Sequence, residues 1–345
     1  MKSFLFYHAT SQASVVIITI ALMLFTGYLM TRITRKFKLP NVTGYILAGI
    51  LMGPYCLDMV PVKVIDGMDF LSDIALAFIA FSTGEFFRFS VLKKNGWKVV
   101  VITVMEAVLA SVCVFAVVYG VLHLNLSFSI VLAALASATA PASTIMTIRQ
   151  TGAKGDFVDT LLQVVALDDV VGLVEYSAAI SIALAALSGG GFQVGNILKP
   201  IFVNGAVLVL GGIFGWLLKC MMPKKKYKDN RLIISVAALF AFCGICSLAD
   251  VSPLLGCMSM GTIYINLSDD DKLFKQLNYF SPPILLLFFV RSGLSFRLDA
   301  LLNPSAGEDG ASLLVIGVAY FLTRIIGKYA GAYLGCMAVH KKKQV

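Results

Sequence analysis

The chain has 345 residues, of which 59% are hydrophobic and 14% are charged, and its formal net charge is +9 at pH 7. Soluble domains carry about 25% charged and about 45–50% apolar residues, so this composition excludes an ordinary soluble domain. Apolar runs long enough to span a membrane recur from Ser14 to Val339, which predicts an all-α, polytopic membrane protein.

Taken in chain order, the apolar runs predict about eleven transmembrane helices of roughly 20 residues each. The first run is too long for a signal peptide and lacks a clear small-residue cleavage site, so we interpret it as the first helix. The expected ranges are 13–31, 41–57, 69–87, 98–122, 127–148, 157–187, 198–220, 231–249, 252–266, 276–296 and 311–338.

Lysine and arginine residues gather in every second loop between these runs, whereas the intervening loops are acidic or nearly neutral. Since basic loops stay in the cytoplasm, the alternation predicts an N-terminus outside the cell membrane and a C-terminus inside. We therefore attribute the net positive charge to basic loops that orient the protein in membrane lipid, and we expect no nucleic-acid partner. The basic residues are Arg32, Arg35, Lys36, Lys38, Arg88, Lys93, Lys94, Lys98, Arg149, Lys154, Lys224, Lys225, Lys226, Lys228, Arg231, Lys272, Lys275, Lys341, Lys342 and Lys343.

Two pairs of apolar runs share glycine patterns, in the same order along the chain. One member of each pair is expected to start inside the cell and the other outside, which is the signature of inverted repeats. We therefore predict a first repeat over 1–187 with six spans, a linker helix over 198–220, and an incomplete second repeat over 231–345 with four spans. The shared patterns are Gly44-x-x-x-x-Gly49 with Gly256-x-x-x-x-Gly261, and Gly84-x-x-x-Arg88 with Gly293-x-x-x-Arg297.

Two adjacent carboxylates stand inside the sixth run. Asp168 and Asp169 have apolar residues on both sides, and a charged carboxylate at mid-bilayer depth costs about 2.5–3.5 kcal/mol. Repulsion between them favours holding a proton, which can then be exchanged for a cation. The pair is a candidate site for a monovalent metal cation; a structural pair satisfied by hydrogen bonds or by an ion pair is the alternative.

The fifth run is interrupted by a proline. Pro141 removes a backbone donor from the middle of the helix, and such a break is tolerated where the backbone lines a cavity or is buried in protein. Thr139, Ser143 and Thr144 add oxygen ligands suited to a hard cation. We expect a discontinuous helix whose ends face the ion; a simple proline kink is the alternative.

The last run carries two basic residues, Arg324 and Lys328, on one helix face. Intramembrane cations need partners. Counting from the run midpoints favours Lys328 as the partner of Asp168, and Arg324 with Glu106 as a second pair, in charge-compensating roles; the alternative is that both cations only hold the bundle together. Glu175 lies two turns beyond Asp168. Its side chain either belongs to the ion path or points outward.

Four segments together resemble the monovalent cation/proton antiporter superfamily, and in particular its bacterial double-aspartate branch. The resemblance covers nearly the whole chain, and it is the combination rather than any single motif that is specific. The segments are Pro40-Asn-Val-Thr-Gly-Tyr-Ile-Leu-Ala-Gly-Ile-Leu-Met-Gly-Pro54, Thr139-Ala-Pro-Ala-Ser-Thr144, Ala166-Leu-Asp-Asp-Val-Val-Gly172 and Arg324-Ile-Ile-Gly-Lys328.

The resemblance implies a homodimer with a panel domain and a moving core domain, in which two broken helices cross near the aspartates. It implies elevator-like exchange of one cation against protons, with Na⁺ or K⁺ and H⁺ as transported ions and no cofactor. Asp169 resembles the ion-binding aspartate, and Asp168 the one that pairs with a basic residue of the late helix. Family members have two further helices after that helix, so the second repeat is expected to be incomplete.

Exchange of Na⁺ for protons is the function that these features favour. The alternatives are a potassium/proton exchanger, a non-transporting fragment or subunit, and an intramembrane enzyme that uses the aspartates for acid/base hydrolysis. The enzyme is disfavoured because adjacent residues of one helix point about 100° apart, so we expect no enzymatic activity.

Overall fold

The computed structural model describes residues 12–139, 141–188, 195–222, 228–268, 270–302 and 312–340. Every regular element within these ranges is an α-helix. The helices are α1 (Gln12–Lys36), α2 (Asn41–Met52), α3 (Val62–Asp66), α4 (Asp69–Gly84), α5 (Phe89–Gly120), α6 (Leu126–Ser137), α7 (Pro141–Thr151), α8 (Asp156–Ser188), α9 (Gly195–Met221), α10 (Lys228–Leu248), α11 (Leu254–Ser268), α12 (Asp271–Phe280), α13 (Pro282–Leu294), α14 (Leu298–Leu302) and α15 (Leu313–Ala338).

The discontinuous helix expected around Pro141 is confirmed. Helix α6 ends at Ser137, and Ala138 has extended backbone with φ −69° and ψ 141°. Helix α7 then starts at Pro141. A proline is tolerated at the first position of a helix because its missing amide hydrogen has no intrahelical acceptor there, so Pro141 opens the second half of the run.

The run expected to form a helix over 276–296 is divided in the structure. Helices α12 and α13 are bent by 51° at a break where Ser281 stands between them. Pro282 and Pro283 follow directly, and they can begin α13 but cannot continue α12, since neither has an amide hydrogen to donate. The consecutive prolines were the sequence signal for this second break.

Five of the described helices are long and apolar enough to cross a membrane, and the bent pair α12–α13 adds a sixth. No more than 33% of the apolar window of any of the five is buried inside the protein. Outward apolar faces of this extent are stable in lipid rather than in water. Helices α2, α6 and α11 are shorter and also apolar. The chain is a multi-pass membrane protein, and the count of about eleven spans stays a prediction.

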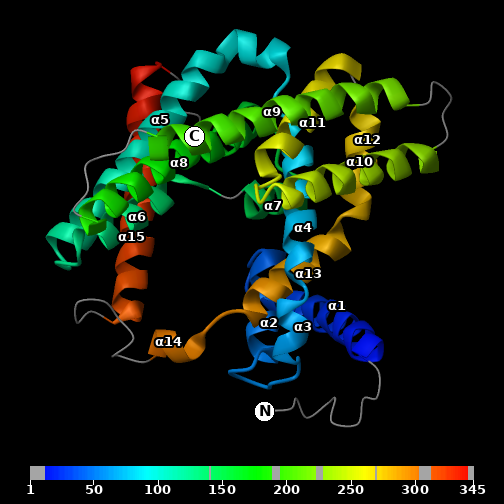
Figure 1. The fold of residues 1–345 in the computed structure, drawn as a ribbon, viewed down its shortest axis with the longest axis horizontal. Helices are drawn as coiled ribbons and strands as arrows, with labels where there is room; N and C mark the ends of the chain where they lie inside the picture. Colours follow the sequence, from blue (N-terminus) through cyan, green and yellow to red (C-terminus); the bar gives the residue numbers. More distant parts are fainter. Residues whose placement is uncertain are drawn as a thin grey trace.

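The helices form two groups (Figure 1). Helices α5, α6, α8 and α15 pack together, and α15 runs along α5. The other group contains α1, α2, α4 and α9–α13, with α11 between α4 and α9. Helix α7 lies between the groups and contacts both α4 and α8. The broken run α6–α7 therefore starts in one group and ends against the other.

Glycines at two helix crossings support the predicted inverted repeats. A Cβ atom on Gly49 of α2 would lie 2.8 Å from the Cα of Gly293 of α13. In the same way, a Cβ on Gly261 of α11 would lie 3.3 Å from the Cα of Gly84 of α4. A two-fold rotation that superposes α2 on α11 and α13 on α4 would also superpose the α2–α13 crossing on the α11–α4 crossing. The domain boundaries stay a prediction, which this reciprocal packing supports.

Candidate functional site

A stripe of glycines brings α15 against α5. Gly327, Gly331 and Gly335 are spaced four residues apart on α15, and all three are buried. A Cβ atom on Gly331 would lie 2.6 Å from the Cα of Glu106 on α5, so any larger residue would force the two helices apart. The close approach places Lys328, which follows Gly327, beside Glu106.

Lys328 joins two carboxylates that come from two different helices. Its Nζ donates to Oδ2 of Asp168 on α8 at 2.8 Å and to Oε1 of Glu106 on α5 at 3.1 Å. The Asp168 side chain is fully buried, and the side chains of Lys328 and Glu106 are 13% and 14% exposed. Buried charges of this kind are tolerated only when they are paired, so each group depends on the others.

Arg324 stabilises the open end of α6. Its Nε donates to the carbonyl oxygen of Ala136 at 3.1 Å, and its Nη2 donates to that of Ala138 at 2.6 Å. The last carbonyls of a helix lack intrahelical donors and carry roughly half a negative charge. A guanidinium at this position satisfies the carbonyls and compensates the charge at the break.

The structure differs from the expected pairing of Arg324 with Glu106. Glu106 accepts from Lys328, while Arg324 donates to backbone carbonyls. The physical reason is the shape of the two cations. A planar guanidinium suits two neighbouring carbonyl oxygens, whereas a compact ammonium fits between two carboxylates. The favoured contact between Lys328 and Asp168 is present.

Helix α8 passes close to the break. A Cβ atom on Gly172 would lie 2.9 Å from the Cβ of Ala138, so the absence of a side chain lets α8 approach the end of α6. Asp168 lies one turn earlier on α8, and the Thr139 hydroxyl lies beside its carboxylate. The hydroxyl can donate to that carboxylate, so the two groups form one polar contact at the break. A carboxylate oxygen and a hydroxyl oxygen therefore meet at the break, where a hard cation could take them as ligands.

The remaining predicted site residues lie on α7 and α8. Ser143 is exposed and Thr144 is half-buried, both in the first turn of α7. Pro141 begins α7 and Asp169 belongs to α8, but their side chains lie outside the described part of the structure. The contacts join Asp168, Glu106, Lys328 and Thr139, and the ion-binding roles of all these residues stay predictions.

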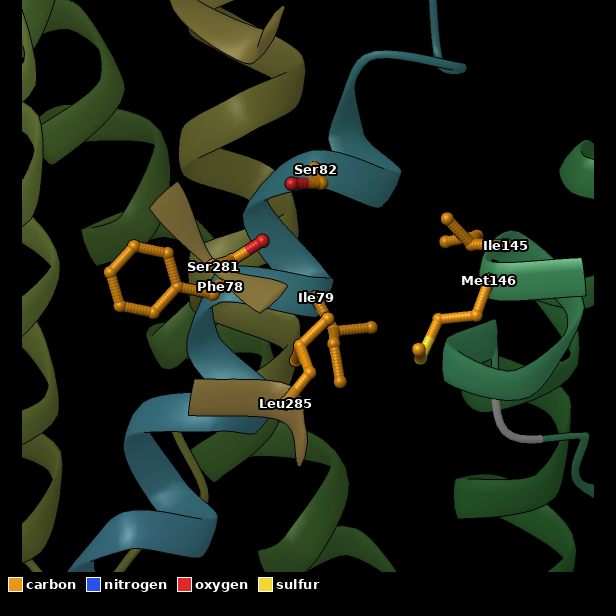
Figure 2. A pocket seen from close by; sticks show the side chains of 7 residues that line it. All are labelled: Phe78, Ile79, Ser82, Ile145, Met146, Ser281 and Leu285. Atoms are coloured by element: carbon orange, nitrogen blue, oxygen red, sulfur yellow. The ribbon is translucent and has the colours of Figure 1, made fainter. Parts of the chain in front are cut away.

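A small pocket separates α7 from the other group of helices. Figure 2 shows Ile145 and Met146 of α7 on one side of it and Ile79, Ser82 and Leu285 on the other. The pocket begins one turn beyond the start of α7. Its lining is mainly apolar, with two hydroxyls, and consists of Phe78, Ile79, Ser82, Ile145, Met146, Ser281 and Leu285.

Sequence reasoning missed the carbonyl acceptors of Arg324 and the double role of Lys328. The carbonyls could have been inferred, because a broken helix leaves acceptors that need a donor. The spacing of Gly327, Gly331 and Gly335 was also visible and predicts a close helix contact. What the sequence does not indicate is the rotation of α5 that directs Glu106 toward that contact.

Comparisons with known proteins place the chain in a family. Residues 20–344 match the model of the family described as "Sodium/hydrogen exchanger, transmembrane". The chain is 26% identical over 354 residues to the Na(+)/H(+) antiporter NhaS4 of Synechocystis sp., a match that covers 95% of this chain and 82% of the relative. It is 23% identical over 277 residues to the iron transporter MagA of Paramagnetospirillum magneticum, covering 78% of this chain. The aligned part spans only 60% of the length of MagA.

The fold is also that of a solved transporter. The sodium proton antiporter MjNhaP1 from Methanocaldococcus jannaschii matches with a TM-score of 0.72 and 20% sequence identity, over 97% of this chain and 80% of that one. At this identity the likeness establishes the fold alone. Since the family model extends over nearly the whole chain, this protein belongs to the transmembrane sodium/hydrogen exchanger family.

Proposed function

We propose that this protein exchanges a monovalent cation, Na⁺ in the first place, for protons by alternating access. The observation that carries the proposal is the buried cluster of Asp168, Lys328 and Glu106 beside the break between α6 and α7. Asp169, the next residue of α8, completes the proposed ion-binding pair. Carboxylate and hydroxyl oxygens at the break are the ligands that hard cations take.

Charge balance explains how a cation and a proton compete. The three acidic residues Glu106, Asp168 and Asp169 and the two basic residues Arg324 and Lys328 leave one net negative charge when all are ionised. One Na⁺ or one proton neutralises that charge, and an interior of low dielectric favours the neutral state. When neither is bound, Lys328 compensates Asp168. A bound cation displaces the Lys328 ammonium from Asp168, and the ammonium then stays paired with Glu106.

The test is exchange by purified protein in liposomes. Asp169→Asn is expected to abolish Na⁺-driven dissipation of a pH gradient, because the amide can neither carry the proton nor supply the charge that holds the cation. Asp159→Asn is the matched control, since Asp159 stands exposed in the first turn of the same helix. Undiminished exchange by Asp169→Asn would contradict the proposed site.

The named relatives differ in cargo, which makes the ion itself part of the proposal. NhaS4 and MjNhaP1 are named for sodium and MagA for iron. The proposed ligands are carboxylate and hydroxyl oxygens, which suit a hard cation better than a transition metal. We therefore propose Na⁺, with K⁺ as the second candidate. Separate jumps of Na⁺, K⁺ and Fe²⁺ in the same liposomes rank the three ions.

The finer features that the family resemblance implies complete the proposal. They are a homodimer in the cell membrane, two inverted repeats, and transport without enzymatic turnover. No cofactor enters the scheme, because the ions and the five charged side chains supply all the charge that it needs.

Two natural cysteines test the proposed orientation, with the N-terminus outside. Cys56 lies exposed after α2, and Cys220 lies exposed near the end of α9. The alternating loop charges put Cys56 outside and Cys220 inside. A membrane-impermeant maleimide added to intact cells should label the wild type, and this label should disappear in Cys56→Ser but remain in Cys220→Ser. The reverse pattern would invert the topology.

A further inference from the structure

Glu175 is an acidic residue of α8 that the proposed exchange leaves unused. It follows Asp168 by seven residues, which is two helical turns, so the two carboxylates lie about 20° apart around the helix. The rise between them is about 10 Å along the helix axis. Glu175 therefore belongs to the same face of α8 as Asp168, nearer to the end that the proposed orientation places outside.

The Glu175 carboxylate lies against α5. Ser111 of α5 donates its hydroxyl to Glu175 Oε2 at 2.5 Å. The second oxygen, Oε1, is buried and has no hydrogen-bond partner. This contact excludes a side chain that points outward into lipid. A buried carboxylate oxygen without a donor has a free acceptor position, which a proton or a passing cation can occupy.

The break between α6 and α7 stands between the two carboxylates. Gly172 lies on α8 between Asp168 and Glu175, and it is the residue against which the end of α6 packs. Helix α5 supplies one partner to each of the two carboxylates. Glu106 is linked to Asp168 through Lys328, and Ser111 donates to Glu175. The interface of α5 and α8 thus holds two carboxylate levels, with the open helix end between them.

The charged groups near this interface are few. Helix α5 contributes Glu106, α8 contributes Asp168 and Asp169, and α15 contributes Arg324 and Lys328. Helix α6 contains no charged residue. Lys328 is hydrogen-bonded to Asp168 and Glu106, and Arg324 to the carbonyls at the end of α6. The Glu175 carboxylate is hydrogen-bonded to a neutral hydroxyl instead, so a proton is the simplest means of neutralising it.

We infer that Glu175 is a second proton-binding group of the exchange path, between Asp168 and the outer surface. In this scheme, which rests on the proposed function, a proton from the outer water binds Glu175. It passes to the Asp168–Asp169 pair as the cation leaves, and Glu175 is ionised again. One proton moves at each step and no electron is transferred.

The test compares Glu175→Gln with Ser111→Ala. Glutamine keeps the size of the side chain and an oxygen that accepts from Ser111, but it cannot bind the proton. Infrared difference spectra of the purified protein in lipid, recorded between high and low pH, should lose one protonated-carboxyl band in Glu175→Gln. The same variant should exchange Na⁺ for protons more slowly than the wild type, with a shifted pH profile. Ser111→Ala removes only the hydrogen bond and should keep the band and most of the exchange rate.

An unchanged carboxyl spectrum, or a wild-type exchange rate and pH profile in Glu175→Gln, overturns the inference. Equal losses of exchange in Glu175→Gln and Ser111→Ala, with the band retained in both, also overturn it, because they show a structural hydrogen bond. Glu175→Asp is the conservative variant, and partial rescue of exchange by it supports a proton-binding role. A wild-type protein that exchanges no ion contradicts the proposed function itself, which distinguishes that failure from failure of the Glu175 inference.

Discussion

Lys328→Gln is expected to produce one of the largest losses of stability among single substitutions in this protein. The substitution leaves Asp168 and Glu106 buried without the cation that both contact. Breaking a buried ion pair by removing one partner costs about 3–5 kcal/mol. Thermal unfolding of the detergent-solubilised protein in Na⁺-free buffer measures the effect, and addition of Na⁺ should recover part of it, since the cation then compensates Asp168.

Two further variants separate charge from packing at this position. Lys328→Arg keeps the positive charge and should lose less stability than Lys328→Gln. The double variant Asp168→Asn with Lys328→Gln removes both the charge and its principal partner, and it should be more stable than Lys328→Gln alone. If Lys328→Gln unfolds at the wild-type temperature, the buried pair does not contribute to the fold as described.

Gly261→Ala is expected to destabilise the crossing of α4 and α11. The added Cβ would lie 2.2 Å from the carbonyl oxygen of Phe81, a backbone atom that cannot rotate away. Overpacking of this kind costs about 1–3 kcal/mol, because the two helices must separate. The predicted two-fold relation makes the crossing of α2 and α13 equivalent to this one. Gly49→Ala at that crossing should therefore lose a similar amount of stability. Thermal unfolding measures both.

Gly244→Ala provides the matched control for the crossing. Gly244 is exposed on α10, and a Cβ there would meet no atom within 4 Å. Alanine is favoured over glycine in a helix by about 0.5–1 kcal/mol, so this variant should be as stable as the wild type or slightly more so. Equal effects of the substitutions at Gly261 and Gly244 would show that helix propensity, and not the close approach, governs both.

Local sequence patterns were sufficient for most of the helical fold. Apolar runs of spanning length marked each long helix, and Pro141 marked the break within the α6–α7 run, because proline acts through its own missing donor. The bend at Ser281 was missed although Pro282 and Pro283 carry the same signal, since the apolar run continued through them. The short helices α3 and α14 were not predicted, because neither contains an apolar run long enough to span a membrane.

The candidate site was only partly predictable, because partners are set by helix rotation and depth. Counting residues from the run midpoints brought Lys328 to the level of Asp168, and the structure contains that contact. The same counting places Glu106 at that depth too, yet the predicted partner of Glu106 was Arg324, which differs from the structure. Side-chain depth alone does not reveal that the end of α6 offers carbonyl oxygens to Arg324, or that Ser111 faces Glu175.

The central claim is competition of a cation and a proton for one carboxylate site. Its most direct test is the transient current of the purified protein in liposomes after a Na⁺ concentration jump at several pH values, with Asp169→Asn as the comparison. We predict a transient current, carried by Na⁺ as it enters the site, whose half-saturating Na⁺ concentration rises as the pH falls, and which is absent in Asp169→Asn. A current of the same size and Na⁺ dependence in Asp169→Asn, or one unaffected by pH in the wild type, would contradict the account.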